Sequence, residues 1–181
     1  MAEIKGIFES LSKTIERPKD ILIKANEILW QALDSKSFVS AAYGYFDSKE
    51  NKLTFARAGH CPLYLLRNND SKEIKPSGLG LGLSDTDYFS RTLEEYSMEL
   101  KENDTIVLFT DGVTEAKNGL LEDFGDKHFL KVLQSNIELS AEELSNKIIQ
   151  EISVFSSSHE QYDDITLVIF KWQQKLKFDG D

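Results

Sequence analysis

The fold of this chain is decided by the stretch IVLFTDGVTE, residues 106–115. Its first five residues are uncharged and rich in β-branched and aromatic side chains, which is typical of a buried strand. Asn103 and Asp104 mark the start of that strand, so Asp111 lies at its far end, where a side chain can leave the core. Gly112 allows a sharp turn there. The stretch predicts either a plain strand-to-turn boundary or a strand that carries Asp111 into a site.

A second segment favours the site. The sequence YDDITLVIFKW, residues 162–172, is another apolar strand, and paired carboxylates stand at its start. Adjacent carboxylates repel each other, and solvent, a helix N-terminus, arginines or a divalent cation can compensate. If the two strands are antiparallel neighbours, Asp111 and Asp163 meet at one edge of a sheet, where their oxygens suit magnesium or manganese. The plain alternative is a solvated turn before the strand.

Periodicity and turn residues place the other elements. Helices are expected at residues 4–15, 18–33, 126–134 and 141–155. Strands are expected at residues 38–46, 53–58, 63–67, 89–96, 106–110 and 165–172, with a polar turn at 68–70. Pro18 suits a first helical turn, and Ser140 with Glu143 forms a capping box. The middle strands are too close together for crossover helices, so the expected class is α+β with an antiparallel sheet.

Several segments, in order, resemble the metal-dependent protein serine/threonine phosphatases of type 2C, in particular their SpoIIE-like or RsbU-like bacterial branch. The matching segments are TDGVTEA (110–116), DDITL (163–167), FVSAAYGYFD (38–47), LTFARAGHCP (53–62, with Cys61 where a proline is common) and LGLG (79–82) followed by Tyr88. The resemblance runs from the first helix to Trp172. It implies a two-layer antiparallel β-sandwich flanked by helices.

The resemblance also implies a chemistry, which is hydrolysis of phosphoserine or phosphothreonine by a water held between two Mn²⁺ or Mg²⁺ ions. Asp111 and Asp163 would hold one ion. Asp164 would replace Asp163 if the register slips by one, or would orient the metal ligands without contacting the ion itself. Gly112 would permit the turn, and Thr114 or Glu115 would shape the rim.

The resemblance further implies partners. In this branch the substrates are phosphorylated regulatory proteins, the anti-sigma-factor antagonists, and an upstream sensor domain in the parent chain controls activity. A non-catalytic regulatory or binding module that keeps the phosphatase fold and recognises a phosphoprotein is the alternative.

One family motif is missing from the chain. The stretch Gly-Asp-x-x-Gly-His-Gly, whose aspartate bridges both metals in the family, has no counterpart here, and residues 1–8 look like the middle of the helix onto which it opens. Residues 1–173 are therefore expected to be an N-terminally truncated phosphatase domain without its first strands and first metal motif, and residues 174–181 a charged tail that frays. Such a chain should be nearly inactive, and its uncovered sheet edge should favour a homodimer. A natural variant that lost the site is the alternative.

Composition narrows the function classes. At 181 residues a single domain is the default, and the net charge of −10 argues against partners such as nucleic acid or an anionic membrane. One cysteine excludes an internal disulfide and suits the cytoplasm, and no apolar run approaches the roughly 20 residues of a membrane span.

The three histidines lack zinc-ligand spacing, and His60 is expected to satisfy local hydrogen bonds. The glycines at 78–82 lack a strand before and a helix after them, so they predict a flexible structural loop rather than a dinucleotide site.

Overall fold

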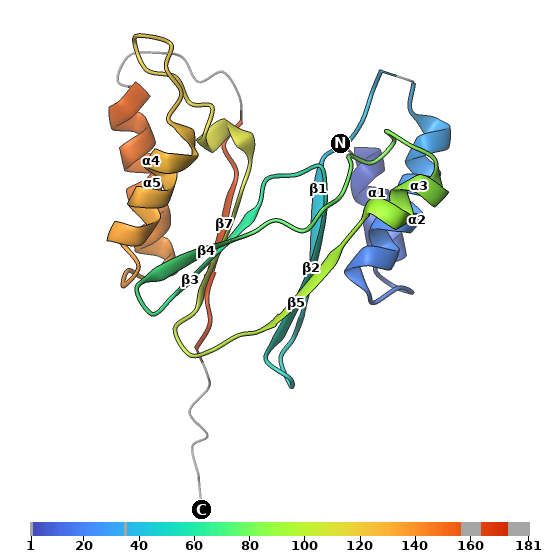
Figure 1. The fold of residues 1–181 in the computed structure, drawn as a ribbon, viewed down its shortest axis with the longest axis horizontal. Coiled ribbons are helices and arrows are strands. Elements are labelled where there is room, and N and C mark those ends of the chain that lie inside the picture. Colours follow the sequence, from blue (N-terminus) through green and yellow to red (C-terminus); the bar gives the residue numbers. More distant parts are fainter. Residues whose placement is uncertain (1, 35, 157–163, 174–181) are drawn as a thin grey trace, which may run out of the picture. The chain divides into compact units, whose positions relative to one another are not determined.

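The computed structural model describes residues 2–34, 36–156 and 164–173, and the chain divides into two units. Unit 1 consists of Met1–Pro62 and Lys75–Leu100, and unit 2 consists of Leu63–Ile74 and Lys101–Asp181. Each unit contains one antiparallel sheet and its own helices (Figure 1). The predicted α+β class with antiparallel strands is therefore confirmed. None of the helices in the described ranges is long and apolar enough to span a bilayer.

Unit 1 is a three-stranded sheet packed against helices. Its elements are α1 (Ala2–Leu11), α2 (Pro18–Ala32), β1 (Ala41–Asp47), β2 (Lys52–Ala58), α3 (Thr86–Thr92) and β5 (Glu95–Glu99), and the strand order is β1-β2-β5. The small residues Ala56 and Ala58 of β2 are completely buried, which lets Leu22 and Leu29 of α2 approach the sheet closely. Burial of this apolar face is the main term that stabilises the unit.

Unit 2 is a four-stranded sheet with two long helices. Its elements are β3 (Leu63–Arg67), β4 (Asp70–Ile74), β6 (Thr105–Phe109), the 3₁₀ turn η1 (Asp111–Val113), α4 (Gly125–Ser135), α5 (Ala141–Ser156) and β7 (Leu167–Lys171), and the strand order is β4-β3-β6-β7. In its core the Phe129 ring packs edge-on against Phe109 and Tyr64, at centroid distances of 4.8 and 5.9 Å. These aromatic contacts join α4 to the two central strands.

Most predicted elements are confirmed within a few residues of their ends. Pro18 begins α2, as predicted. The capping box also forms, since the Glu143 N–H donates to Ser140 Oγ at 3.2 Å and the Ser140 N–H donates to Glu143 Oε2 at 2.9 Å.

The strand predicted at residues 89–96 is wrong over its first half, where the structure has the helix α3. The Asp85 side chain accepts a hydrogen bond from the Tyr88 N–H at 2.9 Å and so caps the start of that helix. Phe89 and Leu93, four residues apart, are then both buried on one helical face. The strand begins only at Glu95, as β5.

Strand β4 was not predicted, because its sequence DSKEI is mostly polar. Asn68 and Asn69 have positive φ values of 50° and 60°, which is the backbone of a type I′ hairpin turn. That turn folds residues 70–74 back onto β3 as an edge strand, where only Ile74 is buried.

The loop predicted at the glycines is confirmed as a loop, but it is firmly packed. Leu81 is completely buried and exchanges two backbone hydrogen bonds with Val39, at 2.9 and 3.0 Å. The buried Asn26 side chain accepts from the Gly82 N–H at 2.8 Å and donates to the Ser84 carbonyl at 3.1 Å. These contacts leave the loop little of the flexibility that was predicted.

Candidate functional site

The candidate site lies at the end of the β6–β7 ladder in unit 2. The two strands are antiparallel, and their register pairs Thr105 with Lys171 at one end and Phe109 with Leu167 at the other. The C-terminal end of β6 and the N-terminal end of β7 therefore lie at the same edge of the sheet. This confirms the antiparallel pairing predicted from the two apolar segments.

Thr110 extends this pairing beyond the ladder. Its N–H donates to the Thr166 carbonyl at 3.1 Å, and its Oγ1 accepts from the Thr166 N–H at 2.9 Å. The same hydroxyl donates to the Asp164 carbonyl at 3.0 Å. One side chain thus fixes the segment that leads into β7 against the segment that leads out of β6. No role for Thr110 was predicted from the sequence, although its place directly before the Asp-Gly pair was the available signal.

The residues after Thr110 form a tight 3₁₀ turn. The Val113 N–H donates to the Thr110 carbonyl at 3.0 Å, and the Glu115 N–H and the Thr114 hydroxyl donate to the Asp111 carbonyl at 2.8 and 3.2 Å. Asp111 is exposed while Val113 is completely buried. The turn therefore holds the Asp111 backbone rigidly and leaves its carboxylate toward solvent.

Gly112 is buried in this turn but does not supply the backbone freedom that was expected of it. Positive φ values among the described glycines occur at Gly59, Gly82 and Gly125, and not at Gly112. The change of direction is made by ordinary 3₁₀ backbone.

The predicted ligands are only partly brought together by the described residues. Asp111 and Asp164 are both exposed and stand at the same edge of the sheet, while Asp163 lies outside the described residues. Within residues 2–34, 36–156 and 164–173, no three His, Cys, Asp or Glu side chains are close enough to hold a metal ion. The oxygen donors of Asp111 and Asp164 fit part of a site for a hard cation such as Mg²⁺ or Mn²⁺.

His60 makes local contacts, as predicted. Its Nδ1 lies 3.4 Å from the Ser40 hydroxyl, and its carbonyl accepts from Arg57 Nη1 at 2.5 Å.

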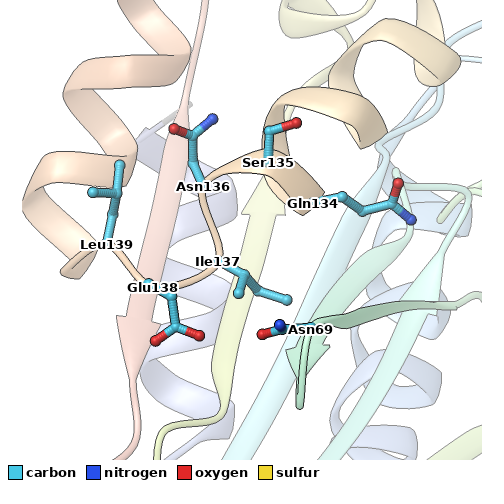
Figure 2. Close-up of a pocket in the computed structure, with 7 residues that line it drawn as sticks. All are labelled: Asn69, Gln134, Ser135, Asn136, Ile137, Glu138 and Leu139. Atoms are coloured by element: carbon cyan, nitrogen blue, oxygen red, sulfur yellow. The ribbon is translucent and has the colours of Figure 1, made fainter.

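A cavity of about 280 Å³ lies elsewhere in unit 2. Figure 2 shows its lining residues, which are Asn69 and residues 134–139 at the end of α4 and directly after it. Lys171 Nζ donates to the nearby carbonyls of Glu138 and Leu139 at 3.3 and 3.1 Å. Since Lys171 is at the opposite end of β7 from Leu167, this cavity is separate from the Asp111 turn.

Comparison with known proteins decides the family. Residues 1–173 match the family model described as Stage II sporulation protein E (SpoIIE). The chain belongs to the SpoIIE family. The predicted resemblance is therefore confirmed.

Two curated proteins are similar to this SpoIIE-family chain. Phosphoserine phosphatase RsbU of Bacillus subtilis is 30% identical over 176 residues, which is 94% of this chain and 50% of RsbU. Protein IcfG of Synechocystis is 28% identical over 136 residues, which is 75% of this chain and 21% of IcfG. The SpoIIE-family chain thus spans half the length of RsbU and about a fifth of IcfG.

Solved structures share the fold of the SpoIIE-family chain. The SiaA-PP2C domain of Pseudomonas aeruginosa has a TM-score of 0.80 at 22% identity, with coverage of 95% of this chain and 67% of that one. The manganese-presoaked phosphatase domain of SpoIIE from Bacillus subtilis has a TM-score of 0.63 at 18% identity, with coverage of 97% and 76%. RsbX in complex with magnesium has a TM-score of 0.63 at 13% identity, with coverage of 94% and 71%. The fold of the chain is therefore that of type-2C phosphatase domains.

Proposed function

We propose that this SpoIIE-family chain is a phosphatase domain, covering residues 1–173, of a metal-dependent protein serine/threonine phosphatase. The observation that carries the proposal is the β6–β7 edge, where Thr110 fixes the backbone on either side and Asp111 presents an exposed carboxylate. A rigid backbone beside an oxygen-rich edge suits a cation site, because ligands that are already positioned lose little entropy on binding.

Asp111 and Asp163 are the proposed ligands of one divalent ion, Mn²⁺ or Mg²⁺. Asp164 either replaces Asp163 or orients it, and the Thr110 hydroxyl supports this role because it holds the Asp164 main chain. A bound ion would lower the pKa of a coordinated water, which is the nucleophile for phosphoester hydrolysis. The roles of the chain's own residues are to position that ion and to leave the phosphate access from solvent. Gly112, Thr114 and Glu115 build the turn and its rim.

The chain alone should be a poor enzyme. It contains no Gly-Asp-x-x-Gly-His-Gly stretch, so the aspartate that would bridge two ions is not supplied by its sequence. We expect Asp111 and Asp163 to bind a single ion weakly and turnover to be close to background. This missing motif is also what favours the second candidate function, a phosphoprotein-binding module without catalysis.

The proposed substrate is a phosphorylated regulatory protein such as an anti-sigma-factor antagonist, in a signalling pathway of the cytoplasm. Similarity to a protein named phosphoserine phosphatase supports the phosphoprotein class. A sensor domain upstream in the parent chain and a homodimer belong to the same proposal. The net charge of −10 disfavours nucleic acid as a partner.

Manganese titration followed by electron paramagnetic resonance tests the ligand assignment. The unsubstituted chain should bind Mn²⁺, and Asp111→Asn and Asp163→Asn should each weaken that binding at least about tenfold, since each removes a charged ligand. Asp126→Asn is the matched control, because Asp126 is also an exposed carboxylate of unit 2, in the first turn of α4. Equal affinities of all four proteins would remove Asp111 and Asp163 from the site.

A phosphatase assay on the full-length protein separates the two candidate functions. The enzyme predicts manganese-dependent release of phosphate from a phosphoserine protein, and this release should be abolished by Asp111→Asn. Binding of the phosphoprotein with no release at any manganese concentration would favour the non-catalytic module.

A further inference from the structure

A short hairpin arm, residues 116–124, follows the Asp111 turn and precedes α4. The Phe124 N–H donates to the Ala116 carbonyl at 2.8 Å, and the Asn118 N–H donates to the Glu122 carbonyl at 3.0 Å. Lys117 and Asp123 form an antiparallel bridge between these two bonds, and their side chains form an ion pair. In Figure 1 this gold segment projects beyond the body of unit 2 between η1 and α4.

The tip of the arm is held in one shape by Asn118. Its Oδ1 accepts from the N–H groups of Leu120 and Glu122, at 2.9 and 3.0 Å, and its Nδ2 donates to Glu122 Oε2 at 2.8 Å. The Asn118 carbonyl also accepts from the Leu121 N–H at 2.9 Å. A tip with this many internal bonds is pre-organised, so it loses little conformational entropy when it binds a partner.

The tip exposes two large apolar side chains. Leu120 is 79% exposed and Leu121 is 62% exposed. A Cβ built on the neighbouring Gly119 meets no atom of the described residues within 4 Å, so Gly119 is not packed against any of them. Exposed leucines at a projecting tip do not stabilise the fold that carries them.

The backbone of Leu121 is strained. Its φ of 62° lies in the left-handed region, which is unfavourable for leucine and which glycine adopts freely. Strained residues of this kind occur mainly at functional sites. A leucine that is both strained and exposed points to a partner that covers it.

The charges of the arm are already engaged within it. Lys117 pairs with Asp123, and the Glu122 carboxylate accepts from Asn118. Only the Lys117–Asp123 pair is neutral, so the tip offers its two leucines beside the negative charge of Glu122, on a chain whose net charge is −10. A protein surface with an apolar patch fits this tip better than a membrane that is anionic or a nucleic acid.

The base of the arm is fixed to the candidate site. The Gly125 N–H donates to the Thr114 carbonyl at 2.8 Å, and the Glu115 N–H donates to the Asp111 carbonyl at 2.8 Å. Six residues from Thr114 to Leu120, at about 3.3 Å each, span at most about 20 Å. A typical partner protein covers about 800 Å² of surface, equivalent to a disc of about 16 Å radius. Such a disc is about 32 Å across, so a protein whose phosphorylated residue lies at Asp111 can also cover the tip.

We propose that the 116–124 arm docks the phosphoprotein substrate, by inserting Leu120 and Leu121 into an apolar patch beside the phosphorylated residue. This inference rests on the proposed phosphatase function and assigns to it a substrate-docking element outside the metal ligands.

Binding measurements test the docking directly. The probes are the phosphorylated anti-sigma-factor antagonists of the source organism, and their affinity for the full-length protein is followed by fluorescence anisotropy. The arm variant carries both Leu120→Ser and Leu121→Gly. It should weaken binding of the true substrate about tenfold or more, because it removes both apolar contacts. Glycine adopts the backbone conformation of residue 121 without strain, so the shape of the arm should be kept. Val154→Ser is the matched control, since Val154 is 68% exposed on α5 of the same unit. Unchanged affinity of the arm variant, or no binding of any probe by the unsubstituted protein, overturns the proposal.

Turnover of a small substrate separates this proposal from the proposed function. In the full-length protein with manganese, hydrolysis of p-nitrophenyl phosphate should be the same with and without the arm substitutions, while kcat/KM for the phosphoprotein falls about tenfold. Equal losses on both substrates would mean that the arm shapes the site and does not dock the substrate, which overturns the inference alone. If the unsubstituted protein hydrolyses neither substrate, the phosphatase function fails, while arm-dependent binding of the phosphoprotein would still support docking.

Discussion

A single buried carboxylate, Asp104, binds two groups at the start of β6, the Arg67 side chain and the Lys101 N–H. It is only 1% exposed. Its oxygens accept from the Arg67 guanidinium, with Nε to Oδ1 at 2.7 Å, and from the Lys101 N–H at 2.7 Å. The sequence indicated only that Asp104 marks the beginning of a strand. The structure adds that the same residue joins β6 to β3.

Replacing Asp104 should be costly. Asp104→Ala removes a buried carboxylate that pairs with the guanidinium of Arg67, whose side chain is 27% exposed, and should lower the free energy of unfolding by about 2–4 kcal/mol. The matched control is Asp87→Ala, because Asp87 faces Arg91 at 3.9 Å with both side chains largely exposed, and such a pair contributes less than about 1 kcal/mol. Urea denaturation of the two variants measures the change in the free energy of unfolding for each. Equal decreases would contradict the buried role of Asp104.

Two glycines should respond in opposite ways to the same substitution. A Cβ on Gly78 would lie 2.0 Å from the Arg57 carbonyl oxygen, which is backbone and cannot easily move, so Gly78→Ala should destabilise the protein by about 3 kcal/mol or more. A Cβ on Gly119 meets open space, so Gly119→Ala should change stability by less than about 1 kcal/mol. Thermal unfolding checks both, and similar melting temperatures for the two variants would contradict the packing described for the 78–82 loop.

At the scale of an element, the start of α5 links a helix cap to pH. The N–H and the hydroxyl of Ser140 hydrogen-bond with Glu143, and these bonds lower the pKa of Glu143 below its ordinary value of 4.5. The unfolded chain therefore binds the proton of Glu143 at higher pH than the folded chain does. Protonation then favours unfolding, so this contribution to stability is present above pH 4.5 and is lost as the pH falls through the lowered pKa.

The matching variants are Glu143→Gln and Ser140→Ala. Glu143→Gln keeps the shape of the capping box without the charge, so its stability deficit relative to the unsubstituted chain should shrink as the pH falls below 4.5. Ser140→Ala removes the cap itself and should cost about 1 kcal/mol at neutral pH. Denaturation series at several pH values measure both effects, and a deficit of Glu143→Gln that does not depend on pH would contradict the linkage.

The sequence predicted those elements in which periodicity and burial agree. The apolar runs of β6 and β7 and the helical faces of α2 and α5 each form where they were expected. It did not predict α3, because a single capping residue, Asp85, decides a helix of only seven residues. It did not predict β4 either, because the edge position of that strand requires no apolar pattern, although the polar turn before it was predicted at residues 68–70.

The site was predictable in part, because one of its residues directly follows an apolar strand. Asp111 stands out because an apolar strand runs directly into it, and the register of two such strands places its turn and Asp164 at one sheet edge. The bridging hydroxyl of Thr110 was not predicted, because a threonine at a strand end has many possible partners. The shape of the 116–124 arm was not predicted either, since a positive φ at Leu121 is not indicated by that residue type.

At the scale of the whole molecule, one outer strand of the unit 2 sheet favours self-association. β7 is the outermost strand of its sheet among the described residues, and its sequence LVIFK is mostly apolar, whereas the outer strand β4 at the other edge is polar. We expect β7 to pair between copies at high concentration. The half-exposed Val168 offers the test, since a lysine on an edge strand opposes such pairing.

Sedimentation velocity over a range of concentrations measures this tendency. The unsubstituted chain should shift from monomer toward dimer as its concentration rises, and Val168→Lys should remain monomeric at little cost in stability. A strict monomer at every concentration would contradict both the edge pairing and the homodimer that was predicted from the sequence.

The division of the chain into units that are each discontinuous in sequence bears on how the protein is synthesised. The hairpin of β3 and β4 belongs to unit 2, yet the residues on both sides of it belong to unit 1, and its partner strand β6 begins about 30 residues after β4 ends. At a translation rate of about 5–20 residues per second, β6 follows β4 by about 2–6 s. During that interval the edge of β3 that pairs with β6, at Tyr64, Leu65 and Leu66, has no partner strand. The yield of folded protein should therefore depend on translation speed and on the chaperones that meet this hairpin first.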